Sequence, residues 1–175
     1  MAKAVMLLMP FLLFSCGGEA PVVESYPDDS AHRIEVNGVE VHYFDFHPDA
    51  GGTPVIYIHG YSGSAFAAYY FKDHLGPEYR LIAPDLPGAG WSEKPPIEYT
   101  TEYYLAFLAS FTEALEIDRF HLMGHSMGGQ LAAMYAADPD RASSVDRLIL
   151  VAPYGLEDEA GVILEFLAEA GVLDD

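Results

Sequence analysis

A serine flanked by glycines stands where a strand pattern gives way to a helix pattern. Residues 124–128 read Gly-His-Ser-Met-Gly, a Gly-x-Ser-x-Gly pentapeptide centred on Ser126. Leu122 and Met123 precede it at the end of an apolar strand, and residues 130–137 continue as a helix. Glycines two before and two after the serine let strand and helix approach each other without Cβ clashes. The hydroxyl of Ser126 is therefore predicted to stand clear of the main chain as a nucleophile.

Two backbone amides are predicted to lie close to this serine. Met127 begins the helix, where a free N–H and the positive end of the helix dipole favour a developing negative charge. A second apolar, β-rich run at residues 53–58 ends in His-Gly-Tyr-Ser-Gly-Ser. A loop that follows a buried strand in this way brings the amide of Tyr61 toward a reacting carbonyl. Tyr61 and Met127 are thus the candidate donors of an oxyanion hole.

A third block follows another strand-like run at residues 79–84. Residues 85–92 read Asp-Leu-Pro-Gly-Ala-Gly-Trp-Ser. Together with His-Gly-Tyr-Ser-Gly-Ser at 59–64 and Gly-His-Ser-Met-Gly-Gly at 124–129, this block resembles the α/β-hydrolase superfamily in order and spacing. The resemblance extends from about Arg33 to Gly155. It implies an α/β fold with a mostly parallel sheet and helices on both faces.

The resemblance also implies a reaction. Ser126 would attack an acyl carbon and form a covalent acyl-enzyme, with the backbone amides of Tyr61 and Met127 holding the oxyanion. The expected partner is a small-molecule acyl substrate with an ester, thioester, lactone or amide bond, and a serine esterase or lipase-like activity is the first expectation. Family members that open epoxides or remove halides carry an aspartate in place of the serine, so those reactions are set aside. No metal or organic cofactor is implied.

A serine hydrolase also needs a base, and a carboxylate that orients the base. In this superfamily they follow in the order serine, acid, histidine. All of the histidines in the sequence precede Ser126: His32, His42, His47, His59, His74, His121 and His125. His125 is expected to pack beneath the turn, because neighbours on a strand point to opposite faces; His59 is expected to make a structural hydrogen bond. The chain as written is therefore expected to be inactive, without its triad acid and histidine.

The elements that position these motifs follow from periodicity. Residues 34–44 alternate around Asn37-Gly38, which predicts a β-hairpin with a two-residue turn. Later strands are predicted to end at Ile58, to cover 81–84, to precede the Ser126 turn and to cover 147–152. Helices are predicted at 65–75, 101–116, 130–137 and 159–173. The inner face of the helix at 101–116 is predicted to consist of Tyr104, Leu105, Leu108, Phe111, Thr112 and Leu115. Strands that alternate with helices predict a mostly parallel sheet. Two aromatic clusters, residues 69–71 and 103–104, either pack on the sheet or line an apolar substrate pocket.

The hydrolase domain, residues 32–175, is expected to be incomplete. In the resembling family two more strands follow, the acid and the histidine lie on the loops after them, and a lid often begins after the sixth strand, here at about residues 155–175. An apolar parallel strand left at a sheet edge is an aggregation site. We therefore expect the N-terminal part of a longer enzyme, truncated after the sixth strand. The alternative is a short, catalytically dead α/β-hydrolase-like binding protein.

The N-terminus has the pattern of a bacterial lipoprotein signal peptide. Residues 1–15 combine a basic start with an apolar run at 4–14, which is shorter than the roughly 20 residues that span a bilayer. Cys16, the only cysteine, follows Leu-Phe-Ser as in a lipobox, and this resemblance implies a lipid-anchored envelope protein; Gly17 implies the outer membrane. The alternative is an ordinary secretory signal with an incidental cysteine. Residues 16–31, rich in Gly, Pro, Ser and acids, are predicted to be a flexible tether.

Composition limits the remaining classes. The 175 residues are 51% hydrophobic, enough for one core but not for two domains. Asp and Glu number 27 against 8 Lys and Arg, a net charge of −19. Such a surface repels nucleic acid, so no nucleic-acid partner is expected.

Overall fold

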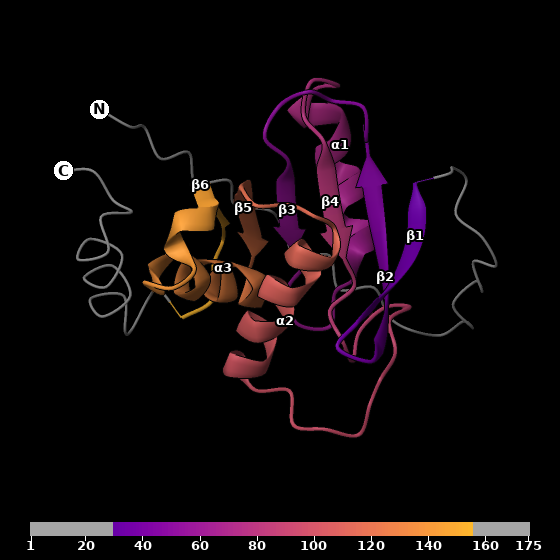
Figure 1. Ribbon diagram of the computed structural model, residues 1–175, viewed down its shortest axis with the longest axis vertical. Coiled ribbons are helices and arrows are strands. Elements are labelled where there is room, and N and C mark those ends of the chain that lie inside the picture. Colours follow the sequence, from indigo (N-terminus) through magenta and orange to yellow (C-terminus); the bar gives the residue numbers. More distant parts are fainter. Residues whose placement is uncertain (1–29, 156–175) are drawn as a thin grey trace, which may run out of the picture.

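The computed structural model describes residues 30–155, which form one six-stranded sheet with helices (Figure 1). The strands are β1 (Ala31–Val36), β2 (Val39–Phe46), β3 (Val55–Ile58), β4 (Leu81–Pro84), β5 (Phe120–His125) and β6 (Val145–Val151). Their order is β1-β2-β4-β3-β5-β6. The β4-β3, β3-β5 and β5-β6 pairs are parallel, whereas β1-β2 and β2-β4 are antiparallel. The predicted mostly parallel sheet is confirmed.

Helices cover both faces of the sheet. The helical elements are η1 (Ala65–Ala68), α1 (Tyr69–Leu75), α2 (Thr101–Ala114), α3 (Met127–Ala137) and η2 (Ala142–Ser144). Side chains alternate along the central strand β3: Ile56 and Ile58 pack with α2 and α3, whereas Val55 and Tyr57 pack with η1 and α1. All four are buried, as expected for a strand covered on both faces.

The hairpin between β1 and β2 turns where the sequence predicts it. Asn37 and Gly38 both have positive φ, 52° and 78°, as a two-residue turn of this hand requires. The Asn37 side-chain amide also donates to the Ser110 hydroxyl at 3.0 Å, which fastens the hairpin to α2.

Helix α2 follows the predicted face but ends two residues early. Thr100 caps its start by accepting the Tyr103 N–H at 3.1 Å. The chain leaves the helix after Ala114, and Glu116 has a φ of 57°. Phe107, absent from the predicted inner face, is buried as well.

The predicted helix at 65–75 is two elements, a 3₁₀ turn (η1) followed by α1. Ser64 provides no side-chain cap there; the Ala65 N–H donates instead to the Asp85 carboxylate at 2.6 Å. That bond ties the first turn to the end of β4.

Several predictions fall on residues outside 30–155 and so lie beyond the described part of the chain. They are the signal peptide, Cys16, nearly all of the tether, the helix at 159–173 and the lid region. β1 begins at Ala31, the last residue of the predicted tether. Within residues 30–155, no helix has the length and apolar character needed to cross a membrane.

Candidate active site

Ser126 occupies a strained turn between β5 and α3. Its φ is 54° and its ψ is −120°, a conformation that a residue with a Cβ rarely adopts. Four backbone hydrogen bonds hold it there. The Ser126 N–H donates to the Val151 carbonyl at 3.1 Å, and the Ser126 carbonyl accepts from the amides of Gly129 (2.8 Å), Gln130 (3.1 Å) and Tyr154 (2.9 Å). The end of β6 and the loop after it therefore fix the turn.

The glycines around Ser126 are required by close packing, as the sequence predicts. A Cβ at Gly124 would overlap the carbonyl oxygen of Gly128. A Cβ at Gly128 would overlap the carbonyl oxygen of Ile58 and lie 2.6 Å from that of His59. Helix α3 thus begins directly against the end of β3, where the predicted oxyanion loop starts.

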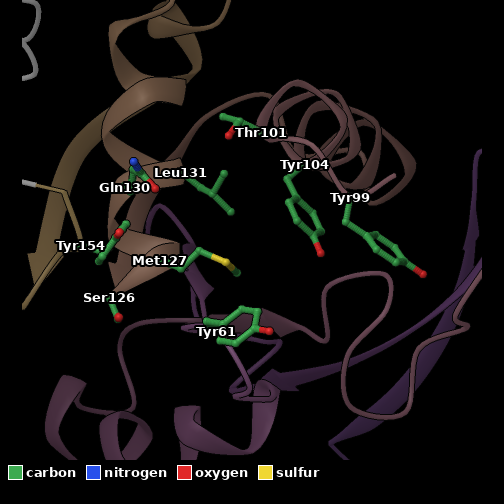
Figure 2. A pocket seen from close by; sticks show the side chains of 9 residues that line it. All are labelled: Tyr61, Tyr99, Thr101, Tyr104, Ser126, Met127, Gln130, Leu131 and Tyr154. Carbon is green, nitrogen blue, oxygen red and sulfur yellow. The ribbon is translucent and has the colours of Figure 1, made fainter. Parts of the chain in front are cut away.

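The structure brings Tyr61 and Met127 to Ser126, from the loop after β3 and the first turn of α3 (Figure 2). A Cβ built on Gly60 would lie only 3.1 Å from the Ser126 Cβ, so the lack of a side chain at Gly60 lets this loop reach the serine. Within residues 30–155, neither the Tyr61 N–H nor the Met127 N–H donates a hydrogen bond. Both amides are therefore available to an oxyanion. Their role in catalysis stays a prediction.

A cavity of about 480 Å³ opens at Ser126. It is lined by Tyr61, Tyr99, Thr101, Tyr104, Ser126, Met127, Gln130, Leu131 and Tyr154 (Figure 2). Of the two aromatic clusters in the sequence, one lines this pocket through Tyr104. The other packs on the sheet through Tyr69 and leaves Tyr70 exposed: the Tyr69 ring meets those of Phe44 and Phe46 edge to face, with centroids 5.2 and 5.0 Å apart.

The buried His59 makes two structural hydrogen bonds. Its Nδ1–H donates to the Gly60 carbonyl at 2.8 Å, and its Nε2 accepts the Leu86 N–H at 3.0 Å. Burial lowers the pKa of His59 below its ordinary value, so the ring stays neutral near pH 7. The predicted structural role of His59 is confirmed.

The prediction for His125 is wrong, because its side chain is exposed and does not pack beneath the turn. His125 is the last residue of β5; it still pairs with Val151 of β6 but lies one residue beyond the end of β3. Its Nδ1 would lie 3.2 Å from a Cβ at Gly60, which places the ring beside the loop after β3. His121, half-buried on the same strand, faces Arg147 of β6.

A buried carboxylate missed by the sequence analysis fastens the loop after β3. Asp85 is 1% exposed and accepts hydrogen bonds from His42 Nδ1 (2.8 Å), the Ala65 N–H (2.6 Å) and the Trp91 N–H (2.9 Å). Gly90 lacks a Cβ that would overlap the carboxyl group. Burial by itself raises the pKa of Asp85, but the bonds from His42 and the two amides outweigh it and hold this pKa below its ordinary value.

Both ends of the segment 59–65, which carries Tyr61, are held by these hydrogen bonds. His59 at its start accepts from the Leu86 N–H, and Ala65 at its end donates to Asp85. The sequence offers two hints: Asp85 follows directly on a strand, and it is the first residue of the block at 85–92 that resembles the family. Its partner His42 lies on β2, far away along the chain, so no local pattern joins the two.

No base is found for Ser126 within the part of the chain that the structure describes, since the serine hydroxyl makes no hydrogen bond there. That the acid and histidine lie further along the protein stays a prediction. Residues 30–155 also contain no group of three or more His, Cys, Asp or Glu side chains placed to hold a metal ion.

Known proteins share this sequence pattern and fold. A sequence profile described as the α/β hydrolase fold matches residues 53–170. The chain is 36% identical over 145 residues to the dihydrolipoyllysine-residue acetyltransferase component of the acetoin cleaving system of Cupriavidus necator, covering 80% of this chain and 37% of that one. It is 37% identical over 132 residues to the 2-hydroxy-6-oxo-2,4-heptadienoate hydrolase of Pseudomonas putida, and the match covers 72% of this chain and 45% of that one.

A solved structure of a bacterial membrane phospholipase A superposes with a TM-score of 0.67 at 32% identity, covering 72% of this chain and 40% of that one. The chain belongs to the α/β-hydrolase superfamily. It spans less than half the length of these relatives.

Proposed function

We propose that this chain is the N-terminal part of a serine hydrolase that cleaves a carboxylic ester through an acyl-enzyme on Ser126. The observation that carries the proposal is the strained turn, which places Ser126 in the lining of a cavity beside the backbone amides of Tyr61 and Met127. Neither amide donates a hydrogen bond within residues 30–155. Fold alone does not choose the reaction. The serine at the nucleophile position and the acyl chemistry in the relatives' names support ester cleavage.

The reaction has two balanced steps. Ser126 Oγ attacks the acyl carbon and loses its proton to a histidine base, which passes it to the departing alcohol as the ester C–O bond breaks. Water then attacks the acyl-enzyme with the same base, releasing the acid and restoring Ser126. In both steps the negative oxygen lies between the Tyr61 and Met127 amides, where losing one donor typically costs about 100- to 1,000-fold in rate. We expect the base and its carboxylate beyond Asp175.

The test is ester turnover by the protein expressed from its full reading frame. We expect hydrolysis of p-nitrophenyl butyrate by wild type and background rates for Ser126→Ala, a loss on the order of a millionfold in kcat. Ser143→Ala is the matched control, because Ser143 is exposed and precedes β6; it should retain wild-type turnover. Equal turnover by Ser126→Ala would contradict the proposal, and a folded wild type without turnover would favour the binding-protein alternative.

We also propose that Cys16 is lipidated and anchors the protein in the bacterial outer membrane. The lipobox-like residues before Cys16 support this proposal, and several acyl chains on one residue anchor firmly, because each buried CH₂ contributes about 0.8 kcal/mol. Growth with an alkyne-tagged fatty acid should label wild type and a Ser25→Ala control but not Cys16→Ser. Label that persists in Cys16→Ser would contradict lipidation.

A further inference from the structure

The chain after β6 bends back onto the nucleophile turn within three residues. The Val151 carbonyl accepts the Ser126 N–H at 3.1 Å, and the Tyr154 N–H donates to the Ser126 carbonyl at 2.9 Å. Both main-chain groups of the serine are therefore bonded to this short loop, and Figure 2 shows Tyr154 beside Ser126. Three residues of extended chain would span about 10 Å, so an extended loop could not make both bonds. A sharp bend between Val151 and Tyr154 is required.

Ala152 supplies this bend through an unfavourable backbone conformation. Its φ is 42°, in the left-handed region that residues with a Cβ rarely adopt. Pro153 follows, and a proline favours extended conformations in the residue before it, which adds to the strain. Ala152 is exposed within residues 30–155, so packing of its methyl group does not impose this conformation. Such strain persists only where other contacts hold the backbone, and here the two bonds to Ser126 do so.

Pro153 packs directly on the first turn of α3 and provides a second attachment. A Cβ built on Gly129 would lie 2.7 Å from the Pro153 Cβ, so the missing side chain at Gly129 lets the proline approach the helix. Gly129 in turn donates its N–H to the Ser126 carbonyl at 2.8 Å. The loop is therefore joined to the turn twice, through hydrogen bonds to Ser126 and through packing on Gly129.

From these observations we infer that Ala152 is a positioning residue: its strained bend holds the Tyr154 amide on the Ser126 carbonyl and so fixes the direction of the Ser126 hydroxyl. A bend that could relax would let the loop move away from the turn, and a displacement of about 1 Å near the reacting atoms can cost about 100-fold in rate. The strain therefore lowers stability and keeps the nucleophile rigid. The inference rests on the proposed ester hydrolysis in its kinetic test and adds a positioning residue to that reaction.

Ala152→Gly tests this role in the protein from its full reading frame. Glycine adopts positive φ without strain and also reaches many other conformations, so the substitution removes the strain and the constraint together. We expect kcat for p-nitrophenyl butyrate to fall about 10- to 100-fold, with KM within about twofold of wild type. The midpoint of thermal unfolding should equal or exceed that of wild type. A residue with only a structural role would instead lose stability together with activity.

Two variants serve as matched controls. Ala152→Asn keeps a Cβ but tolerates the left-handed region, so it should retain the wild-type kcat. Glu116→Gly removes another positive φ, 57°, at an exposed residue before β5, at the far end of that strand from Ser126, and should also leave kcat unchanged. A loss of kcat in either control equal to that in Ala152→Gly would contradict the positioning role.

Hydrogen exchange reports the position of the loop without any reaction. The Tyr154 N–H, protected by its bond to Ser126, should exchange at least about tenfold faster in Ala152→Gly than in wild type, and at the wild-type rate in Ala152→Asn. Wild type that cleaves no ester contradicts the proposed function, and the exchange rates then decide the inference. Equal exchange of Tyr154 in Ala152→Gly and wild type, an equal kcat in an active enzyme, or a much lower thermal midpoint in Ala152→Gly would overturn it.

Discussion

Replacing Asp85 by asparagine tests the buried network that holds the predicted oxyanion loop. The wild-type carboxylate accepts three hydrogen bonds, with Oδ1 serving Ala65 and Oδ2 serving both His42 and Trp91. An asparagine has a single acceptor oxygen. In its better orientation this oxygen keeps the two bonds of Oδ2, and the amide nitrogen faces the Ala65 N–H, donor against donor.

The cost follows from this count. One buried donor without an acceptor costs about 1–3 kcal/mol, and each of the two remaining bonds loses about 1 kcal/mol when its acceptor becomes neutral. A neutral amide is less costly to bury than a carboxylate, which offsets part of the loss. We therefore expect Asp85→Asn to lower the free energy of unfolding by about 2–4 kcal/mol, a large share of the roughly 5–15 kcal/mol typical of a domain.

Urea unfolding at pH 7 measures this change on the protein from its full reading frame. Asp73→Asn is the control, since the Asp73 side chain is 73% exposed beside Lys72 and its loss should cost under about 0.5 kcal/mol. The pKa of Asp85 is lowered in the fold, so its contribution is present at neutral pH and is lost as the pH falls below about 4, toward the folded pKa. Equal stability of Asp85→Asn and wild type at pH 7, or a difference that does not shrink in acid, would refute the reasoning.

Three further changes test other parts of the site. Gly128→Ala forces a methyl group into the Ile58 carbonyl and should lower the free energy of unfolding in urea by about 1–3 kcal/mol. Gly51→Ala is the control, because nothing lies within 4 Å of its new Cβ, and it should lower this free energy by less than about 0.5 kcal/mol. Similar losses in the two variants would argue against tight packing at Gly128. Thermal unfolding should show Ser126→Gly to have a free energy of unfolding about 1 kcal/mol higher than Ser126→Ala, because glycine tolerates positive φ. The reverse order of stability would argue against backbone strain at this position. The pKa of His59 is lowered, so the unfolded chain binds more protons and stability should fall as pH drops below about 6.5. In His59→Gln the free energy of unfolding should fall less steeply with decreasing pH than in wild type. An unchanged pH dependence would mean that groups other than His59 cause the loss of stability.

What the sequence could predict was local in the chain. The hairpin follows from Asn37-Gly38 between alternating residues, and the Ser126 turn follows from glycines at fixed offsets between a strand and a helix. In both places the conformation depends on neighbours a few residues away. These elements were predicted with ends within a few residues of those observed.

What the sequence could not predict depends on contacts between distant segments. The Asp85 network joins β2, the end of β4 and the loop after β3, and no spacing in the chain reveals that three segments meet there. His125 was placed wrongly because alternation predicts which face of the strand a side chain takes but not whether other residues cover it, and His125 lies one residue beyond the end of β3. Phe107 is buried because α2 packs against both β1 and α3, which together cover more of the helix than one stripe of side chains.

The central claim is that Ser126 is a nucleophile at an oxyanion site, and covalent labelling tests it most directly. The protein from its full reading frame is treated with a fluorophosphonate, and the modified residue is located by peptide mass spectrometry. We predict one adduct, on Ser126, that is absent from Ser126→Ala and retained in Ser143→Ala. A folded protein that forms no adduct, or an adduct that persists in Ser126→Ala, would contradict the account.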